Sequence, residues 1–363
     1  MCSDIGIEGY KLLKYILLQC RGGFEAECAA EIAEHCSAIE IAGFPRFEVN
    51  SGYVLYEVFG DALECIQRIP FRSLIFVRQW FACLPVFDDL PSHDRLSVLL
   101  GTVADLPVSA ELLAEVPDTT VGREVLPFAG KLASAMAQTL RQQGVMLPRK
   151  ARADWRMHLF ALSGKKLFVG VSPKRNSSNL EMGIRRLKFP GAAPSRSTLK
   201  LEEAWHWFIP QAEWSERLGG GKTAVDLGAA PGGWTWQLVK QGMFVTSVDN
   251  GPMAESLMDT GQVTHEKADA FHFQPAKPVD WMVCDVADKP ARVTSRMLDW
   301  ALNGWCHEMI FNLKLPMKKR YQEVRQSLAL IEQELQEVGI SYRLSARHLY
   351  HDREEITCHL VLR

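Results

Sequence analysis

The chain has 363 residues, a formal net charge of -2 and 23% charged residues, as expected for a globular protein of two or three domains. This balance excludes a protein that is basic throughout, so any nucleic-acid footprint has to be local. No apolar run reaches the roughly 20 residues of a membrane span, and no signal-peptide cleavage site follows the apolar segment Tyr15–Cys20, so we expect a cytoplasmic protein without a membrane partner.

The nine cysteines form no C-x-x-C pair, and no histidine pair has zinc-ligand spacing. We therefore expect no metal site. The cysteines are interpreted as small buried hydrophobic residues in a reducing compartment.

The first predicted unit alternates strands and helices in the order β-α-β-β-α-β, which is that of a ferredoxin-like unit. Asn50-Ser51-Gly52 predicts a turn between the two middle strands, and Asp61 predicts a helix N-cap. The expected elements are strands at Lys14–Cys20, Arg46–Val49, Tyr53–Phe59 and Phe76–Leu84, and helices at Phe24–Cys36 and Asp61–Arg68. We assign residues 14–90 to this unit and 1–13 to an N-terminal extension.

A second small α/β unit is predicted over residues 91–175. It contains a helix at Gly122–Gln143 and strands at Met157–Ala161 and Leu167–Val171. A polar run follows from Pro173, and we assign 176–193 to a linker between domains.

Longer strand–helix alternation over residues 194–363 predicts a doubly wound parallel sheet of Rossmann-like type. The expected strands are Lys222–Leu227, Phe244–Val248, Trp281–Cys284, Met309–Leu313, Ser341–Ala346 and Ile356–Leu362. Helices are expected at Gly233–Gln241 and Tyr321–Val338.

A glycine-rich turn, residues 226–235 with the sequence DLGAAPGGWT, joins a predicted strand to a predicted helix. Glycines allow a sharp turn and a close approach of backbone to ligand. Asp249 ends the next strand, where a carboxylate can accept bonds from ribose hydroxyls. The turn fails the G-x-G-x-x-G spacing and lacks the lysine of a P-loop, which disfavours a nicotinamide dinucleotide and favours a nucleoside ligand without pyrophosphate.

The turn resembles the first motif of S-adenosylmethionine-dependent methyltransferases, in the form found in FtsJ-type RNA ribose methyltransferases. This resemblance implies S-adenosylmethionine as the cofactor. It also implies that Asp269 lies beside the adenine.

Four polar positions resemble the Lys-Asp-Lys-Glu tetrad of the FtsJ-type ribose 2′-O-methyltransferases: Lys200, Asp285, Lys314 and Glu355. Asp285 and Lys314 each end a predicted strand, and the carboxyl ends of parallel strands share one edge of a sheet. Glu354 remains open as an alternative to Glu355.

A ribose hydroxyl needs a base before it can attack a methyl group. A lysine serves as that base only while it is neutral, and burial or a neighbouring cation favours the neutral form. We expect Lys200 to lie beside Lys314, Asp285 to orient Lys314, and Glu355 to hold Lys200. This arrangement makes Lys314 the general base.

Two alternatives are weighed against ribose methylation. Base methylation is disfavoured because Asp285-Val286-Ala287-Asp288 lacks the N-P-P or D-P-P loop of amino methylation, and neither Cys284 nor Cys358 has the context of a C5-methylation nucleophile. A non-catalytic RNA-binding assembly factor is disfavoured because all four tetrad positions are intact.

Basic residues gather locally despite the balanced total, and such patches bind phosphates. The clusters are Lys314, Lys318, Lys319 and Arg320; Arg185, Arg186 and Lys188; Arg149, Lys150, Arg152 and Arg156; and Lys165, Lys166, Lys174 and Arg175.

Further segments resemble the bacterial RlmM family, namely residues 71–76, 78–80, 182–190, 249–253, 311–321 and 349–355. The resemblance implies methylation of a cytidine ribose in 23S ribosomal RNA before full subunit assembly, by a protein that we expect to be a monomer. It also implies an N-terminal ferredoxin-like plus THUMP arrangement. The implied cofactor contacts are Ser197, Gly228, Ala230, Pro231, Gly232, Gly233, Asp249, Asp269 and Asp285.

Overall fold

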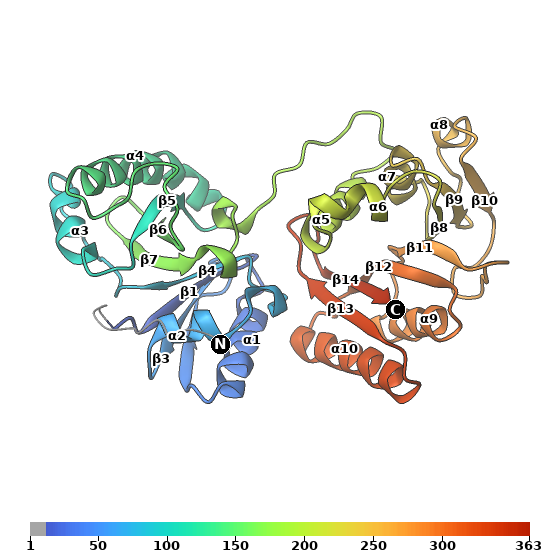
Figure 1. Ribbon diagram of the computed structural model, residues 1–363, viewed down its shortest axis with the longest axis horizontal. Helices are drawn as coiled ribbons and strands as arrows, with labels where there is room; N and C mark the ends of the chain where they lie inside the picture. Colours follow the sequence, from blue (N-terminus) through green and yellow to red (C-terminus); the bar gives the residue numbers. More distant parts are fainter. Residues whose placement is uncertain (1–11) are drawn as a thin grey trace. The chain divides into compact units, whose positions relative to one another are not determined.

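The computed structural model describes residues 12–363, which form two compact units, one ending at Ile184 and the other running from Arg185 to Arg363. Each unit has its own seven-stranded sheet (Figure 1). The expected extension over residues 1–13 falls almost entirely outside the described residues. The THUMP assignment and the expected domain limits stay predictions.

The first unit has the strand order β2-β3-β1-β4-β7-β6-β5. Its strands are β1 (Tyr15–Gln19), β2 (Gly43–Arg46), β3 (Tyr53–Val58), β4 (Gln79–Cys83), β5 (Ser109–Glu115), β6 (Trp155–Ala161) and β7 (Leu167–Pro173). Its α-helices are α1 (Glu25–Ala38), α2 (Ala62–Arg68), α3 (Arg95–Val103) and α4 (Thr120–Gln142). The ferredoxin-like order β-α-β-β-α-β is confirmed over β1 to β4.

One predicted strand of this unit was wrong. The expected strand Arg46–Val49 lies too far along the chain, because β2 occupies Gly43–Arg46 and pairs with β3. Pro45 is tolerated there because β2 is an edge strand. The backbone beyond it turns back through Asn50, whose N–H donates to the buried Glu25 carboxylate at 3.2 Å.

The two α/β units expected in the N-terminal half share one sheet, because β4 pairs with β7. Gly170 in β7 permits this pairing, since a Cβ there would collide with the carbonyl oxygen of Ala82. The polar run that follows β7 is also bound to this unit: Asn176 Oδ1 accepts from the N–H of Phe71 at 2.8 Å, and the N–H of Met182 donates to Glu115 at 2.6 Å.

The second unit has the strand order β10-β9-β8-β11-β12-β14-β13. Its strands are β8 (Thr223–Leu227), β9 (Phe244–Val248), β10 (Val263–Glu266), β11 (Val279–Cys284), β12 (Cys306–Lys314), β13 (Tyr342–Arg347) and β14 (Glu355–Leu362). Its α-helices are α5 (Thr198–Phe208), α6 (Trp214–Arg217), α7 (Gly233–Lys240), α8 (Glu255–Met258), α9 (Pro290–Leu302) and α10 (Arg320–Glu337).

The Rossmann-like fold is confirmed, with α5 and α7 on one face of this sheet and α9 and α10 on the other (Figure 1). Strands β8 to β12 are parallel, whereas β14 is antiparallel to both β12 and β13. Strand β8 pairs with β9 on one side and with β11 on the other, so the connections after β8 run toward opposite edges of the sheet. This is the switch point at which such sheets bind ligands.

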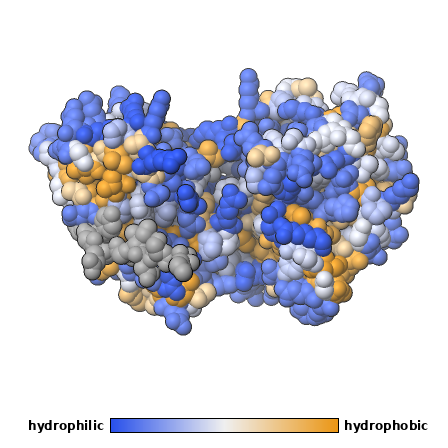
Figure 2. Space-filling model, in the orientation of Figure 1, coloured by the Kyte–Doolittle hydropathy of each residue, from blue (hydrophilic) through white to orange (hydrophobic). Residues whose placement is uncertain are grey.

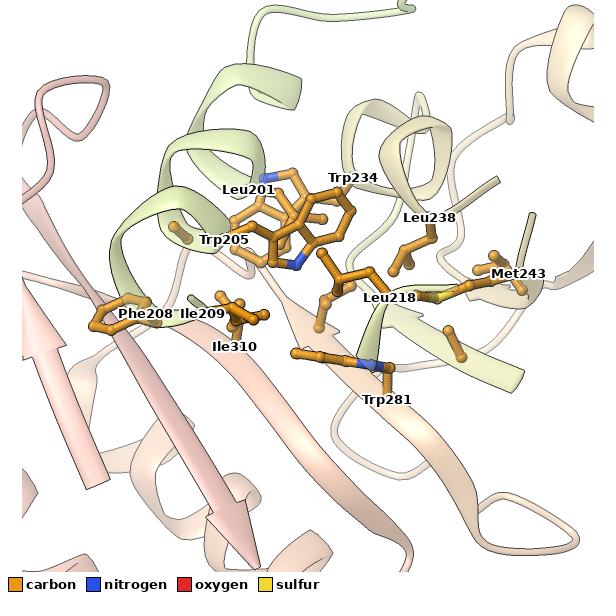
Figure 3. Packing of buried hydrophobic residues seen from close by; sticks show 14 of the residues in the cluster. Leu201, Trp205, Phe208, Ile209, Leu218, Trp234, Leu238, Met243, Trp281 and Ile310 are labelled. Carbon is orange, nitrogen blue, oxygen red and sulfur yellow. The ribbon is translucent and has the colours of Figure 1, made fainter. Parts of the chain in front are cut away.

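A tryptophan-rich core packs α5 and α7 onto the second sheet (Figure 3). Trp205, Trp234 and Trp281 are each at most 2% exposed and come from α5, α7 and β11. Burial of such large apolar side chains is the main force that holds a helix against a sheet. The core thereby fixes α5, the helix that carries Lys200.

The visible face of each unit is mostly hydrophilic, with smaller hydrophobic patches (Figure 2). None of the helices within residues 12–363 is long and apolar enough to cross a membrane. All eight cysteines in this described range are buried and free of disulfides.

Candidate active site

The glycine turn between β8 and α7 depends on two left-handed glycines. Gly228 has φ +77° and its N–H donates to the carbonyl of Val248 at 2.9 Å. Gly232 has φ +113°, and a Cβ there would collide with the side chain of Leu257. Both positions therefore favour glycine, because side chains rarely adopt this backbone conformation.

Asp249 ties this turn to the end of β9. Its Oδ2 accepts from the N–H of Ala230 at 3.1 Å, and its Oδ1 accepts from the N–H of Gly251 at 2.7 Å. Within the turn, the peptide bond that joins Ala230 to Pro231 is cis. Each carboxylate oxygen has two lone pairs, so Asp249 can still accept bonds from a ligand.

Carboxylates concentrate at this edge of the sheet. Asp226 is buried at the end of β8 and accepts from Thr235 Oγ1 at 2.6 Å. Burial raises the pKa of Asp226 to about 7, and the nearby carboxylates of Asp285 and Asp249 add to the shift. The edge therefore favours a ligand with positive charge.

Ser197 lies where the start of α5 meets the start of α7. Its carbonyl accepts from Trp234 Nε1 at 3.0 Å, and its hydroxyl lies 2.6 Å from that of Ser195. A Cβ on Gly233 would collide with both hydroxyls, so the two helices approach closely only because residue 233 is glycine. The structure thus brings Ser197 against the glycine turn.

Asp269, the residue expected beside an adenine, lies in the loop after β10 and has local polar contacts. It accepts from the N–H of Phe271 and from His272 Nδ1, both at 2.9 Å. The Phe271 N–H is the main cause that lowers the pKa of Asp269.

Lys200 is the centre of the predicted tetrad. Its Nζ lies 3.0 Å from Asp285 Oδ2 and 2.5 Å from Glu355 Oε1. Although burial disfavours its charge, the two carboxylates raise the pKa of Lys200 above its usual value. The surroundings of Lys200 therefore favour its charged ammonium form over a neutral base.

Lys314, at the end of β12, is exposed and pairs in register with Glu355 of β14. The expected contact between Asp285 and Lys314 is not formed, because α5 places Lys200 over the end of β11 and Asp285 binds that lysine. Burial raises the pKa of Glu355, while the charges of Lys200 and Lys314 oppose that shift. Lys314 thus lies within electrostatic reach of the group formed by Lys200, Asp285 and Glu355.

The two adjacent glutamates, which the sequence left as alternatives, have different partners. Glu355 contacts Lys200, whereas Glu354 is 56% exposed and forms an ion pair with Arg320 at 2.7 Å. Glu355 is therefore the one of the two glutamates that contacts Lys200.

Asn312 is a site residue that the sequence analysis missed. Its Nδ2 donates to Asp285 Oδ1 at 2.7 Å, and its Oδ1 accepts from Thr357 Oγ1 at 2.8 Å. Alternate residues of a strand share a face, so Asn312 and Lys314 continue the face of β12 on which Ile310 packs in the tryptophan-rich core. A polar residue inside the apolar run Met309–Leu313 was the available signal.

Glu203, one helical turn after Lys200, was also missed. Its buried carboxylate accepts from the N–H groups of Tyr350 and His351, both at 2.9 Å. It thereby anchors to α5 the loop that leads into Glu355.

Five residues assigned to basic RNA-binding clusters form ion pairs, namely Arg156, Lys165, Lys166, Lys174 and Arg320. Arg156 is 4% exposed and binds Glu111 at 2.9 Å and the carbonyl of Ser178 at 2.5 Å. Arg320 is 18% exposed and binds Glu354. Arg149 and Lys150, in contrast, line a cavity of about 460 Å³ between β5 and α4.

Comparison with known proteins defines the class of the second unit. Residues 193–336 match the family described as FtsJ-like methyltransferase, and the chain is therefore a methyltransferase. Residues 13–81 match the RlmM ferredoxin-like domain, and residues 94–173 match the N-terminal region of ribosomal RNA large subunit methyltransferase M.

Two relatives named ribosomal RNA large subunit methyltransferase M extend this match over nearly the whole chain. The protein of Dickeya chrysanthemi (strain Ech1591) is 51% identical over 348 residues, and that of Photorhabdus laumondii subsp. laumondii is 52% identical over 349; each alignment covers 95% of both chains. The chain belongs to the RlmM family. Among solved structures, TrmN from Thermus thermophilus aligns with 96% of this chain and 99% of its own at 14% identity, with a TM-score of 0.32 that is too low to support a further conclusion.

Proposed function

We propose that this methyltransferase transfers a methyl group from S-adenosylmethionine to the ribose 2′-hydroxyl of a cytidine in 23S ribosomal RNA, with Lys314 as the general base. The relatives' name supports large-subunit ribosomal RNA as the substrate. The observation that carries the ribose chemistry is the ammonium group of Lys200 held between Asp285 and Glu355, with Lys314 in register opposite Glu355.

The residues around the glycine turn fit the proposed cofactor. S-adenosylmethionine supplies an activated methyl group on a sulfonium cation, and the carboxylates of Asp249 and Asp285 at this edge would complement its positive charge. Asp249 would accept bonds from ribose hydroxyls, and Asp269 would lie on the adenine side. Ser197, Gly228 and the turn 230–233 would line the rest of the cofactor pocket.

The tetrad divides the work between its two lysines. Lys200 contacts both carboxylate oxygens of Asp285 and one of Glu355, so its positive charge would stabilise the negative charge that develops on the ribose oxygen. Lys314 would accept the hydroxyl proton. Asp285 and Glu355 keep Lys200 charged and oriented, and Asn312 holds Asp285 in place.

The proposal extends to the oligomeric state, the cellular location and the assembly state of the RNA. We propose that the enzyme acts as a monomer in the cytoplasm on 23S ribosomal RNA before the large subunit is fully assembled.

Replacement of Lys314 tests this proposal. We expect Lys314→Ala to lower the single-turnover rate of methylation about 100- to 10,000-fold, the usual contribution of a general base. Binding of S-adenosylmethionine should be unchanged. The substrate is 23S ribosomal RNA from cells that lack this gene. The methylated nucleoside is identified by mass spectrometry after digestion of the RNA. Methylation of the ribose is checked by the resistance of the adjacent phosphodiester bond to alkaline hydrolysis.

The control is Lys277→Ala, which removes an exposed lysine from the loop before β11, at the opposite edge of the sheet. Full activity of Lys314→Ala would reject Lys314 as the base. A methyl group found on the base instead of the ribose would reject the ribose chemistry.

A further inference from the structure

The loop of residues 315–319, which joins β12 to α10, presents one apolar side chain beside the tetrad. Met317 is 90% exposed, the largest value among the exposed large hydrophobic residues of the described chain. A single exposed apolar residue is ordinary on a protein surface. Met317 is unusual because it lies three positions after Lys314, on a loop that is tied down at both ends.

Contacts with the segment that carries Glu355 fix this loop. At its start, Leu315 is buried and its N–H donates to the carbonyl of Glu354 at 2.7 Å. At its end, Arg320 binds the Glu354 carboxylate at 2.7 Å and the carbonyl of Pro316 at 3.3 Å. These contacts hold the loop in position relative to Lys314, and Arg320 links the loop to Glu354.

The exposed side chains around Met317 are cationic. Lys314, Lys318 and Lys319 are all exposed, and the neighbouring acid Glu354 is already paired with Arg320. An apolar tip among lysines suits a chain that alternates phosphates with flat bases. Single-stranded RNA has this chemistry. Proteins bind its backbone with cations and its bases with aromatic side chains, and the polarizable thioether of methionine also packs on aromatic rings.

We propose that the loop 315–319 is an RNA-positioning element. Met317 packs against a base next to the reacting nucleotide, and Lys318 and Lys319 bind the flanking phosphates. This places the ribose hydroxyl in front of Lys314 and Lys200. The inference rests on the proposed function and adds a substrate contact outside the tetrad and the cofactor turn.

Replacement of Met317 tests the inference. We expect Met317→Ala to raise the KM for 23S ribosomal RNA about tenfold, the size of one lost side chain–base contact, with kcat close to that of the unaltered protein. Met317→Phe, which retains an apolar surface for stacking, should keep the KM within about twofold of the original. The Lys318→Gln, Lys319→Gln double variant should weaken RNA binding and flatten its dependence on salt.

The matched control is Leu302→Ala, which trims a 40% exposed leucine at the end of α9. Binding of S-adenosylmethionine and Tm should be the same in all four variants, because none touches the cofactor turn or the core. A Met317→Ala protein that behaves like Leu302→Ala, while the unaltered protein methylates RNA, would overturn the loop proposal and leave the proposed function intact.

Two further outcomes are informative. Failure of the unaltered protein to methylate 23S ribosomal RNA would overturn the proposed function, and the loop proposal with it. A defect of Met317→Ala on assembled ribosomal particles but not on protein-free RNA would mean that Met317 contacts a protein, which would also overturn the inference.

Discussion

Lys200 keeps its charge because two carboxylates enclose its ammonium group. Its side chain is 18% exposed, so water screens these ion pairs only partly. Lys314 lies in a more open position at the strand end, next to Glu355. Two lysines that look equivalent in the sequence thus have different surroundings, and this difference underlies the roles that we propose for them.

The buried carboxyl of Asp226 predicts how stability depends on pH. Burial raises its pKa from 3.8 to about 7, so the folded state binds this proton more tightly than the unfolded state. The stability linked to the proton is complete below the unfolded pKa and is lost as pH rises through the folded pKa. Asp226→Asn, which mimics the protonated group, should escape this loss. We expect its free energy of unfolding, relative to the unaltered protein, to increase by roughly 2–3 kcal/mol between about pH 5 and about pH 8 in urea titrations.

Asp280 provides the control for this measurement. Although burial disfavours its charge, hydrogen bonds from Thr223 and the charge of Lys222 lower its pKa below 3.8. Its stability contribution therefore changes only below that pH, and the effect of Asp280→Asn should be constant between about pH 5 and about pH 8. A constant difference for Asp226→Asn as well would contradict the assignment of a proton to Asp226.

The turn from β8 into α7 depends on backbone shape at the scale of secondary-structure elements. We expect Gly232→Ala to destabilise the protein by about 1–3 kcal/mol, because Gly232 is left-handed and its missing Cβ makes room for Leu257. It should also abolish binding of S-adenosylmethionine, measured by calorimetry. Gly221→Ala is the matched control: Gly221 has φ +83° but open space around it, so that variant should show the conformational strain and retain cofactor binding. Normal cofactor binding by Gly232→Ala would show that the turn tolerates a side chain.

Local signals predicted several of these elements well. The N-cap at Asp61 was confirmed, since its side chain accepts from the N–H of Leu63 at 3.0 Å. Apolar runs located six of the seven strands of the second sheet and missed the short edge strand β10. The position of β2 was wrong because pairing with β3, and not local composition, decides it.

The candidate site was predictable only where a residue ends a strand or follows a motif. Such signals placed Asp285 and Lys314 at one edge, but they could not say which lysine Asp285 binds. The lysine that Asp285 binds is determined by the position of α5, a helix that was not predicted from the sequence. The tryptophan-rich core fixes the position of α5 on the sheet. Contacts across many residues, such as that from Glu203 to the loop before β14, leave no local pattern.

At the scale of the whole molecule, the boundary between the two units lies between Ile184 and Arg185, within the range 176–193 expected for a linker. Residues up to Ile184 belong to the first unit, and residues 185–197 contain no helix or strand. We expect limited trypsin digestion to cut first after Arg185, Arg186 or Lys188. This cleavage should give two fragments whose masses match those of the two units. Mass spectrometry of the fragments checks this. Early cleavage at Arg175, which is exposed but lies within the bound polar run, would contradict the boundary.

The pairing of β4 with β7 has a consequence for any attempt to trim the protein. Dividing the chain between the matched regions 13–81 and 94–173 would separate β4 from β7, which pair through Cys83 and Gly170. Each fragment would then have an unpaired edge strand. Unpaired edges recruit other strands, so such fragments would be prone to aggregate. We therefore expect the N-terminal half to unfold as one piece, even though two family descriptions divide it.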